Sequence, residues 1–254
     1  MKPVIGIDIG GTKTAGVVWD GKKILNELTI ITPKTLLEFE RHLLKLVDFL
    51  STGRKIGGVG IGIAGQVDNK KGVVGHSPNM PFIKNLKLAN FFRVNGINNV
   101  KIDNDASGFT RGEMNLGQGK KFKNFIGLTL GTGVGGGIVI NRQLYRGLNN
   151  SGAELGHAVI GDEFFEAAFR RLRDKRDYKQ AGKLIGKALA SYINIFAPEA
   201  IIIGGGFGRN EQKKYLPAAN IEIKKYLFNK KINTKILISK LNNAGALGAA
   251  LLVI

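Results

Sequence analysis

The sequence predicts an α/β protein in which one strand–turn–strand unit occurs twice. The first copy is the Gly-rich stretch of residues 4–19, and the second is the stretch of residues 125–140. Gly10 matches Gly131 at an offset of 121 residues, and further identical positions share that offset. Such repetition indicates a duplicated supersecondary unit that closes two turns around one ligand, with chance similarity as the alternative. Apolar runs that alternate with helical patterns complete the α/β prediction.

The first copy carries polar residues at its turn. Asp8 stands in the first apolar run, and the turn then reads Gly10, Gly11, Thr12, Lys13, Thr14. Glycine lets the backbone bend tightly and present N–H groups, which suits a phosphate. A carboxylate beside such a turn can hold a hydrated magnesium ion, and it would be costly as mere core. The alternative is an ordinary Gly-rich hairpin.

Hydrophobic spacing and Gly or Pro boundaries predict the remaining elements. Leucines at helical spacing indicate the clearest helix, at 33–52, and Asp162 is a fair N-cap for another. Helices are expected at 33–52, 86–92, 106–116, 162–174, 180–196, 211–228 and 243–252. Strands are expected at 22–31, 57–64, 99–102, 200–203 and 234–239, with a polar loop after the turn at 65–68.

Composition narrows the class of protein. The 254 residues are 43% hydrophobic and include 36 glycines, which is typical of a turn-rich globular protein. The absence of cysteine excludes disulfides and thiol catalysis, and it fits a cytoplasmic protein. No signal-peptide pattern and no membrane-length apolar run occur, so no membrane association is expected.

The formal net charge of +19 is the unusual feature of the composition. A basic protein can bind nucleic acid, an anionic membrane surface or anionic small molecules. Its lysines are spread along the chain, and the densest basic run, at 170–176, has no interleaved aromatic residues. We therefore expect solvated surface or general attraction to anions, and no specific nucleic-acid site.

Three Gly-rich turns end predicted strands. They are Gly10-Gly11, Gly131-Thr132-Gly133 and Gly204-Gly205-Gly206. In open α/β sheets, ligands bind beyond the carboxyl ends of the strands. The first two turns suit phosphates, and the third, at a helix start, suits close approach to an adenine or ribose. None is a Walker A motif or a dinucleotide fingerprint.

Eight short motifs follow one another along the chain. They are Asp8-x-Gly-Gly-Thr-Lys-Thr14, Gly62-Ile-Ala-Gly-Gln-Val-Asp68, Pro78-Asn-Met-Pro81, Asn104-Asp-Ala106, Leu130-Gly-Thr-Gly-Val-Gly-Gly-Gly137, Glu154-Leu-Gly-His157, Ile203-Gly-Gly-Gly206 and Ala246-Leu-Gly-Ala-Ala250. Over nearly the whole chain they resemble the ROK family (repressor, open reading frame, kinase). The resemblance implies the two-lobed actin-like ATPase (ribonuclease H-like) fold with an internal duplication. It also implies a small lobe at 1–107, completed by the helix at 243–254, and a larger lobe at 108–242.

The resemblance implies an activity and a set of site residues. The activity is ATP- and Mg²⁺-dependent phosphorylation of a hexose, at O6 of glucose or a related hexose, in a cytoplasmic homodimer. Fructose, mannose, N-acetylglucosamine and N-acetylmannosamine are alternative sugars. The general base is Asp105, and the sugar contacts are Gly65, Asn79, Asn104 and Glu154. Asp8 holds Mg²⁺ through water, and the phosphates lie against Thr12, Lys13 and Thr132. From the residues alone, Asp105 could equally be a helix N-cap and Asn104 a turn residue.

One segment departs from the family pattern. Family kinases usually carry a Cys-rich zinc loop after the Glu-x-Gly-His motif, with the histidine as a ligand. Here no cysteine follows His157, so zinc is not expected. Phe164 stands where a cysteine would, as a candidate hydrophobic plug. Glu166 is either the remaining sugar-binding glutamate or a solvated helix residue, and His157 could still contact sugar.

Two other functions stay open at this point. ROK repressors exist, so a sugar-sensing regulator associated with nucleic acid is an alternative. A degenerate kinase that binds sugar without turnover is a further one, because the loop is shortened.

Overall fold

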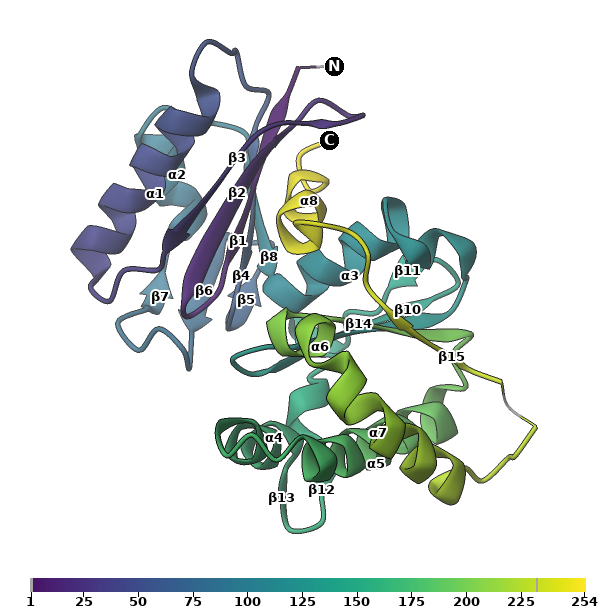
Figure 1. Ribbon diagram of the computed structural model, residues 1–254. Helices are drawn as coiled ribbons and strands as arrows, with labels where there is room; N and C mark the ends of the chain where they lie inside the picture. The colour runs from purple at the N-terminus through teal and green to yellow at the C-terminus, as the bar shows by residue number, and fades with distance from the viewer. Residues whose placement is uncertain (1, 232) are drawn as a thin grey trace. The chain divides into compact units, whose positions relative to one another are not determined.

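The computed structural model describes residues 2–231 and 233–254, and the chain folds into two compact units (Figure 1). Unit 1 contains the residues up to Gly117, then Arg146–Gly152 and Leu241–Ile254. Unit 2 contains Gln118–Tyr145 and Ala153–Lys240. The short segment Arg146–Gly152 thus belongs to unit 1 although unit 2 holds its neighbours in sequence. The lobe boundaries expected at 107/108 and 242/243 stay a prediction.

Unit 1 is built on a five-stranded sheet with the order β3-β2-β1-β4-β8. Its strands are β1 (Val4–Ile9), β2 (Lys13–Trp19), β3 (Ile24–Ile31), β4 (Val59–Ile63) and β8 (Val100–Asn104). β1 pairs antiparallel with β2 and parallel with β4, and β4 pairs parallel with β8. The carboxyl ends of β1, β4 and β8 therefore meet at one edge of this sheet.

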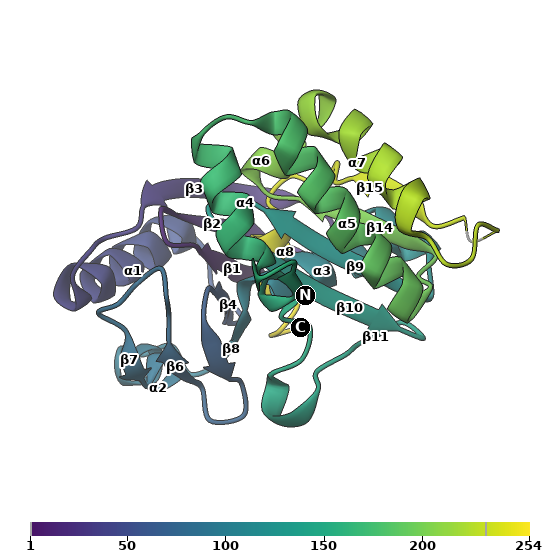
Figure 2. The same cartoon turned by 90° about the horizontal axis from the view of Figure 1, so that it is seen from below.

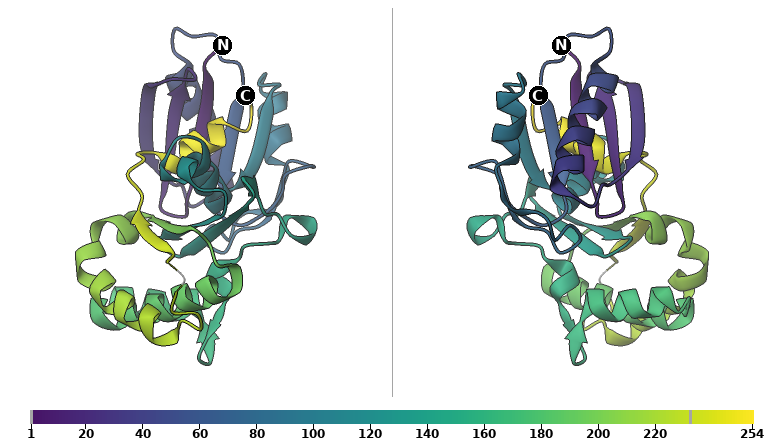
Figure 3. Two further views of the ribbon diagram at one scale, coloured as in Figure 1. Left: turned by 90° about the vertical axis from the view of Figure 1, so that its right-hand side faces the viewer. Right: turned by 90° about the vertical axis from the view of Figure 1, so that its left-hand side faces the viewer.

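Helices cover both faces of the unit 1 sheet. They are α1 (Leu36–Ser51), α2 (Leu88–Val94), α3 (Asp105–Asn115) and α8 (Ala244–Ala250). Figure 3 shows α1 on one side of the sheet and α8 on the other. Small residues allow α8 to approach closely: a Cβ added at Gly6 would lie 1.9 Å from the carbonyl oxygen of Ala246, and one at Gly248 would lie 1.8 Å from that of Gly108. The C-terminal helix therefore packs on β1 and on α3 almost backbone to backbone.

Unit 2 repeats the same sheet. Its strands are β9 (Phe125–Leu130), β10 (Val134–Ile140), β11 (Gln143–Leu144), β14 (Ala200–Gly204) and β15 (Lys235–Ile238), in the order β11-β10-β9-β14-β15. Its α-helices are α4 (Phe165–Asp174), α5 (Tyr178–Phe196), α6 (Gly206–Asn210) and α7 (Gln212–Tyr226), and Figure 2 shows α4, α5 and α7 on one side of the sheet. A buried apolar cluster that includes Phe165, Phe169 and Tyr215 joins these helices to the strands.

The internal duplication is confirmed, because both sheets combine two antiparallel pairs with two parallel pairs in one order. The two copies differ by one residue in the turn. Ile9 pairs with Thr14, which leaves a turn of four residues, whereas Leu130 pairs with Val134, which leaves three. The offset of 121 residues therefore aligns β1 with β9. It is one residue too long for β2 and β10, because the second turn is one residue shorter.

The segment before α4 was predicted wrongly. The helix expected from 162, with Asp162 as its N-cap, begins only at Phe165. Residues 159–164 instead form a hairpin of β12 (Val159–Ile160) and β13 (Glu163–Phe164), with Gly161 at φ +74°. The Arg171 guanidinium donates to both carboxylate oxygens of Glu163, which fastens the hairpin to α4.

The region expected as a polar loop contains a small sheet. It consists of β5 (Gln66–Asp68), β6 (Val73–His76) and β7 (Lys84–Leu86), all antiparallel. Three 3₁₀ turns, η1 (Gln118–Lys121), η2 (Leu148–Asn150) and η3 (Leu155–His157), complete the elements of the described residues. Within residues 2–231 and 233–254, no helix is long and apolar enough to cross a membrane.

Candidate active site

Asp8 lies near the carboxyl end of β1 and is partly buried. Burial, together with the negative charge of Asp105, raises the pKa of Asp8 to about 7. A Cβ added at Gly245 would lie 2.2 Å from Oδ2 of Asp8, so the start of α8 packs directly on this carboxylate. A divalent cation would offset both negative charges, and a single carboxylate suits Mg²⁺, which keeps most of its waters. Across the described residues, no group of three or more His, Cys, Asp or Glu side chains is placed to hold a metal.

The turn of residues 10–13, here called the first Gly turn, is held by hydrogen bonds to its backbone carbonyls. The Gly10 N–H donates to the Lys13 carbonyl at 3.0 Å, which closes the turn. The Thr32 hydroxyl donates to the Gly10 carbonyl at 2.7 Å, and the Lys34 ammonium donates to the Gly11 carbonyl at 2.8 Å. Side chains that follow β3 therefore satisfy the carbonyls of the turn.

Asp105 is the first residue of α3, where that helix leaves β8. The cap of the helix is its neighbour, since Asn104 Oδ1 accepts the N–H groups of Ala106 at 2.9 Å and Ser107 at 3.2 Å. Asn104 Nδ2 donates to the Gly65 carbonyl at 3.2 Å. The N-cap role weighed for Asp105 thus belongs to Asn104. A sugar contact by Asn104 stays a prediction.

Two further predicted residues lie in the same part of unit 1. Gly65 adopts φ +130°, and a Cβ there would lie 2.4 Å from the His76 carbonyl oxygen, so only glycine fits. A Cβ added at Gly11 would lie 2.5 Å from the Asn79 Cβ, which places Asn79 against the first Gly turn. Unit 1 thus brings these predicted magnesium, phosphate and sugar residues to one edge of its sheet.

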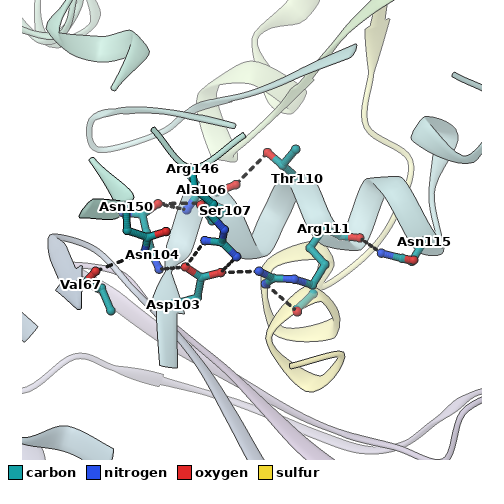
Figure 4. A network of polar contacts seen from close by, with 11 residues as sticks. Val67, Asp103, Asn104, Ala106, Ser107, Thr110, Arg111, Asn115, Arg146 and Asn150 are labelled. Atoms are coloured by element: carbon teal, nitrogen blue, oxygen red, sulfur yellow. Dashed lines mark hydrogen bonds and ion pairs between the residues drawn. The ribbon is translucent and has the colours of Figure 1, made fainter. Parts of the chain in front are cut away.

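Asp103 joins this region although sequence reasoning gave it no role. Its side chain is fully buried and accepts hydrogen bonds from the guanidinium groups of Arg111 and Arg146 (Figure 4). A detectable signal was present, because an acid at the end of a predicted strand, directly before Asn104, needs a cationic partner if it is buried.

The turn of residues 131–133, the second Gly turn, belongs to unit 2. The Gly131 N–H donates to the Gly133 carbonyl at 2.9 Å. Arg173 Nη1, from α4, donates to the carbonyls of Gly131 at 2.7 Å and Thr132 at 2.6 Å. Helix α4 therefore satisfies the carbonyls of this turn with one guanidinium.

Glu166 also lies against the second Gly turn. Its Oε2 accepts the Val134 N–H at 2.7 Å, and its Oε1 pairs with Arg170 at 2.8 Å. A Cβ added at Gly133 would lie 2.4 Å from Glu166 Oε2, so the turn and the carboxylate are in close contact. These contacts support the turn, and the predicted sugar contact of Glu166 remains a prediction.

The turn of residues 204–206, the third Gly turn, ends β14 beside the second. Gly204 is the last residue of the strand. Gly205 adopts φ +79°, and a Cβ added there would lie 2.3 Å from the Leu130 carbonyl oxygen, so there is no room for a side chain. Gly206 faces open space, since a Cβ there would meet no atom within 4 Å. A flat group such as a nucleoside could approach this backbone closely.

Glu154 and His157 flank the 3₁₀ turn η3. The His157 Nδ1 lies 3.6 Å from the Glu154 carboxylate, and both side chains are exposed. The Phe164 ring lies edge-on to the imidazole, with 5.4 Å between ring centroids. Because Phe164 is 52% exposed, it is a neighbour of His157 and not a buried plug.

Comparison with known proteins identifies the family. The family model "ROK family" matches residues 4–168 and 170–254. A glucokinase of Thermotoga maritima is 28% identical over 98% of this chain and 96% of its own length. A ROK glucokinase of Streptomyces griseus, solved with glucose and AMPPNP, is 26% identical with a TM-score of 0.87 and 99% coverage of both chains.

An inorganic polyphosphate/ATP-glucomannokinase of Arthrobacter is similarly close in structure. It is 27% identical to this chain with a TM-score of 0.82, covering 100% of this chain and 98% of its own. These full-length structural matches agree with the two duplicated sheets of the chain. The chain belongs to the ROK family, with the two-lobed actin-like fold, and is an ATP-dependent sugar kinase.

Proposed function

We propose that this kinase transfers the γ-phosphate of ATP to the 6-hydroxyl of glucose or of a related hexose. The observation that carries the proposal is the pair Asp8 and Asp105 beside the first Gly turn, within one sheet edge of unit 1. A phosphoryl transfer needs a charge-neutralised phosphate and a carboxylate that accepts the proton of the hydroxyl. The named glucokinases among the relatives support glucose as the first sugar to test.

The residues divide the work by their chemistry. Asp105 accepts the hydroxyl proton of the sugar, and Asn104 fixes the start of α3 beneath it. Asp8 holds the magnesium ion through water, and the bound ion supplies charge neutralisation for the phosphates. Amide and carboxylate groups recognise sugar hydroxyls in pairs, which suits Asn79 and Glu154. His157 and Glu166 are the further candidates for the sugar, and Gly65 admits it close to the backbone.

The Gly turns bind the nucleotide in this proposal. The first Gly turn, with Thr12 and Lys13, and the second, with Thr132, present backbone N–H groups to the phosphates. In both turns, side-chain donors satisfy backbone carbonyls and so fix the shape of the turn that would receive an anion. The third Gly turn receives the adenosine, because Gly206 leaves its surroundings open.

The test is coupled ADP release with a sugar panel. Glucose, fructose, mannose, N-acetylglucosamine and N-acetylmannosamine are compared at fixed ATP and Mg²⁺. Asp105→Asn should abolish turnover while sugar binding stays measurable, and Asp48→Asn, an exposed change on α1, should alter neither. If the wild type turns over and the Asp105→Asn variant keeps that turnover, Asp105 is not the group that accepts the hydroxyl proton.

Polyphosphate is a second phosphoryl donor to test. The chain carries 38 Lys and Arg against 19 Asp and Glu, and this excess favours a long polyanion. The Arthrobacter structure that this chain resembles is of a polyphosphate/ATP-glucomannokinase. Formation of sugar phosphate from glucose and polyphosphate, with a steep loss on raising salt, is the expected result. If the protein uses ATP and not polyphosphate as the donor, its excess of positive charge does not serve to bind a polyphosphate donor.

The regulator alternative predicts a different outcome. A gel shift with sequence preference at physiological salt, without sugar turnover, would favour it. Binding that depends only on salt would reduce the charge to a non-specific effect. The homodimer and the cytoplasmic location expected from the sequence stay predictions.

A further inference from the structure

One fully buried carboxylate connects three separate segments of unit 1. Asp103 Oδ1 accepts from Arg146 Nη1 at 2.7 Å, and Oδ2 accepts from Arg146 Nη2 at 2.9 Å. Arg111 donates to the same Oδ2, and the backbone N–H of Asn104 donates to Oδ1 at 3.0 Å. Figure 4 shows the two guanidinium groups converging on Asp103 from different elements.

Each partner comes from a different part of the unit. Arg111 lies on α3 and also donates to the Gly248 carbonyl of α8 at 3.3 Å. Arg146 begins the segment Arg146–Gly152, and Asn150 of that segment donates to the Val67 carbonyl of β5 at 3.3 Å. The Asp103 carboxylate therefore sets the end of β8 against α3 and against this segment at once.

The charges at Asp103 specify geometry more than they favour stability. Burial alone would raise the pKa of Asp103, and the Arg146 hydrogen bonds and the two cationic charges hold it below its ordinary value. Because well-packed apolar residues often stabilise a fold as much as a buried ion pair does, stability alone does not call for this arrangement. A bidentate pair adds fixed direction as well as attraction.

Asp103 lies two residues before the proposed base. Asn104, whose N–H binds Asp103, caps α3 through its side chain, and Asp105 is the first residue of that helix. A rotation of the strand end at Asp103 would therefore turn the cap and move the Asp105 carboxylate. In near-attack geometry, a displacement of about 1 Å can cost about a hundredfold in rate.

We propose that Asp103 and Arg146 form a positioning clamp that fixes the direction in which Asp105 is presented to the sugar hydroxyl. The clamp acts through the backbone of Asn104 and touches no reacting atom. This inference rests on the proposed role of Asp105 as the base.

The test replaces Arg146, the cationic member of the clamp. Arg146→Gln removes the bidentate pair, and Arg111 still faces Asp103, so the fold should persist. We expect kcat to fall by about ten- to a hundredfold while KM for ATP changes less than about twofold. Arg146→Lys keeps one charged donor and should recover part of kcat. Arg142→Gln is the matched control, because Arg142 is exposed and donates to the Lys120 carbonyl.

A double variant separates positioning from general weakening. In the Asp105→Asn background, Arg146→Gln should lower the residual rate by no more than about twofold, because the group it positions is already gone. Equal losses with and without Asp105, or an unchanged kcat with a lowered melting temperature, would overturn the clamp. If Arg146→Gln does not fold, Arg146→Lys carries the same comparison. Full turnover by Asp105→Asn alone would instead reject the base assignment.

Discussion

The first and second Gly turns are duplicated hairpins with different charges at their strand ends. Asp8 stands near the end of β1, and the residue that corresponds to it on β9 is Thr129. Both positions are partly buried beside a turn closed by a glycine N–H. One copy therefore carries a negative charge suited to a cation, and the other carries a neutral hydroxyl. The two copies thus keep a closed turn and differ in the charge beside it.

The side chains that hydrogen-bond to the backbone of the two turns also differ. Thr32 and Lys34 follow β3 and hold the carbonyls of the first turn. Arg173 and Glu166 project from α4 and hold the second. The elements that support each turn are thus unrelated, although both satisfy the carbonyls.

The largest effect is expected at the position where the copies differ in charge. Asp8→Asn keeps the shape and removes the carboxylate that would hold the magnesium ion through water, so kcat should fall by about a hundredfold or more. Thr129→Val, the matched change in unit 2, should lower kcat by less than about threefold. Steady-state kinetics over a range of Mg²⁺ concentration measures both. Equal losses in the two variants would remove the distinction between the turns.

Asp8 also makes the metal-free protein sensitive to pH. Its pKa is about 7 in the folded state and 3.8 is the ordinary value, so the native state binds more protons between these values. Stability therefore falls as pH rises from about 4 to about 7, by at most roughly 4 kcal/mol. Asp8→Asn lacks this loss and should be the more stable protein at pH 8 without Mg²⁺. Urea unfolding of both proteins at pH 5 and pH 8 checks the sign.

A smaller effect is expected from adding a methyl group to each turn. In the first turn, Gly11→Ala would place Cβ 2.5 Å from the Asn79 Cβ, and in the second, Gly131→Ala would meet nothing closer than 4.0 Å. Gly11→Ala should therefore cost about 1–3 kcal/mol by overpacking and raise KM for the sugar about tenfold through Asn79. Gly131→Ala should keep its stability and change only KM for ATP. Thermal melts and separate KM values for the two substrates distinguish these outcomes.

The sequence predicted the turns better than the residues that hold them. Gly10 and Gly131 were recognisable because Gly-rich turns follow apolar strands at both places, and the repeat made both visible. The support from Arg173 was not, since it comes from a helix 41 residues after Thr132 and no local pattern links the two. Asp103 was visible as an acid at a strand end. Its partner Arg146 follows after 43 residues, so only the fold brings them together.

The hairpin at 159–164 shows why the start of α4 was mistaken. Asp162 is a good N-cap residue, and local propensity placed the helix there. The positive φ of Gly161 and the ion pair of Glu163 with Arg171 favour a hairpin instead. Tertiary contacts thus override the capping preference.

The smallest effect is expected from removing the side chains that donate to the carbonyls of the two turns. Arg173→Met removes donors to two carbonyls of the second turn, and Lys34→Met removes one exposed donor from the first. Because Arg173 is mostly buried and Lys34 is exposed to water, which replaces its hydrogen bond, the losses should be unequal. We expect KM for ATP to rise about five- to tenfold in Arg173→Met and less than about twofold in Lys34→Met, with sugar KM unchanged in both. Titration of ATP at saturating sugar measures the ratio, and a larger effect from Lys34 would show that the first turn depends on its support more than the second.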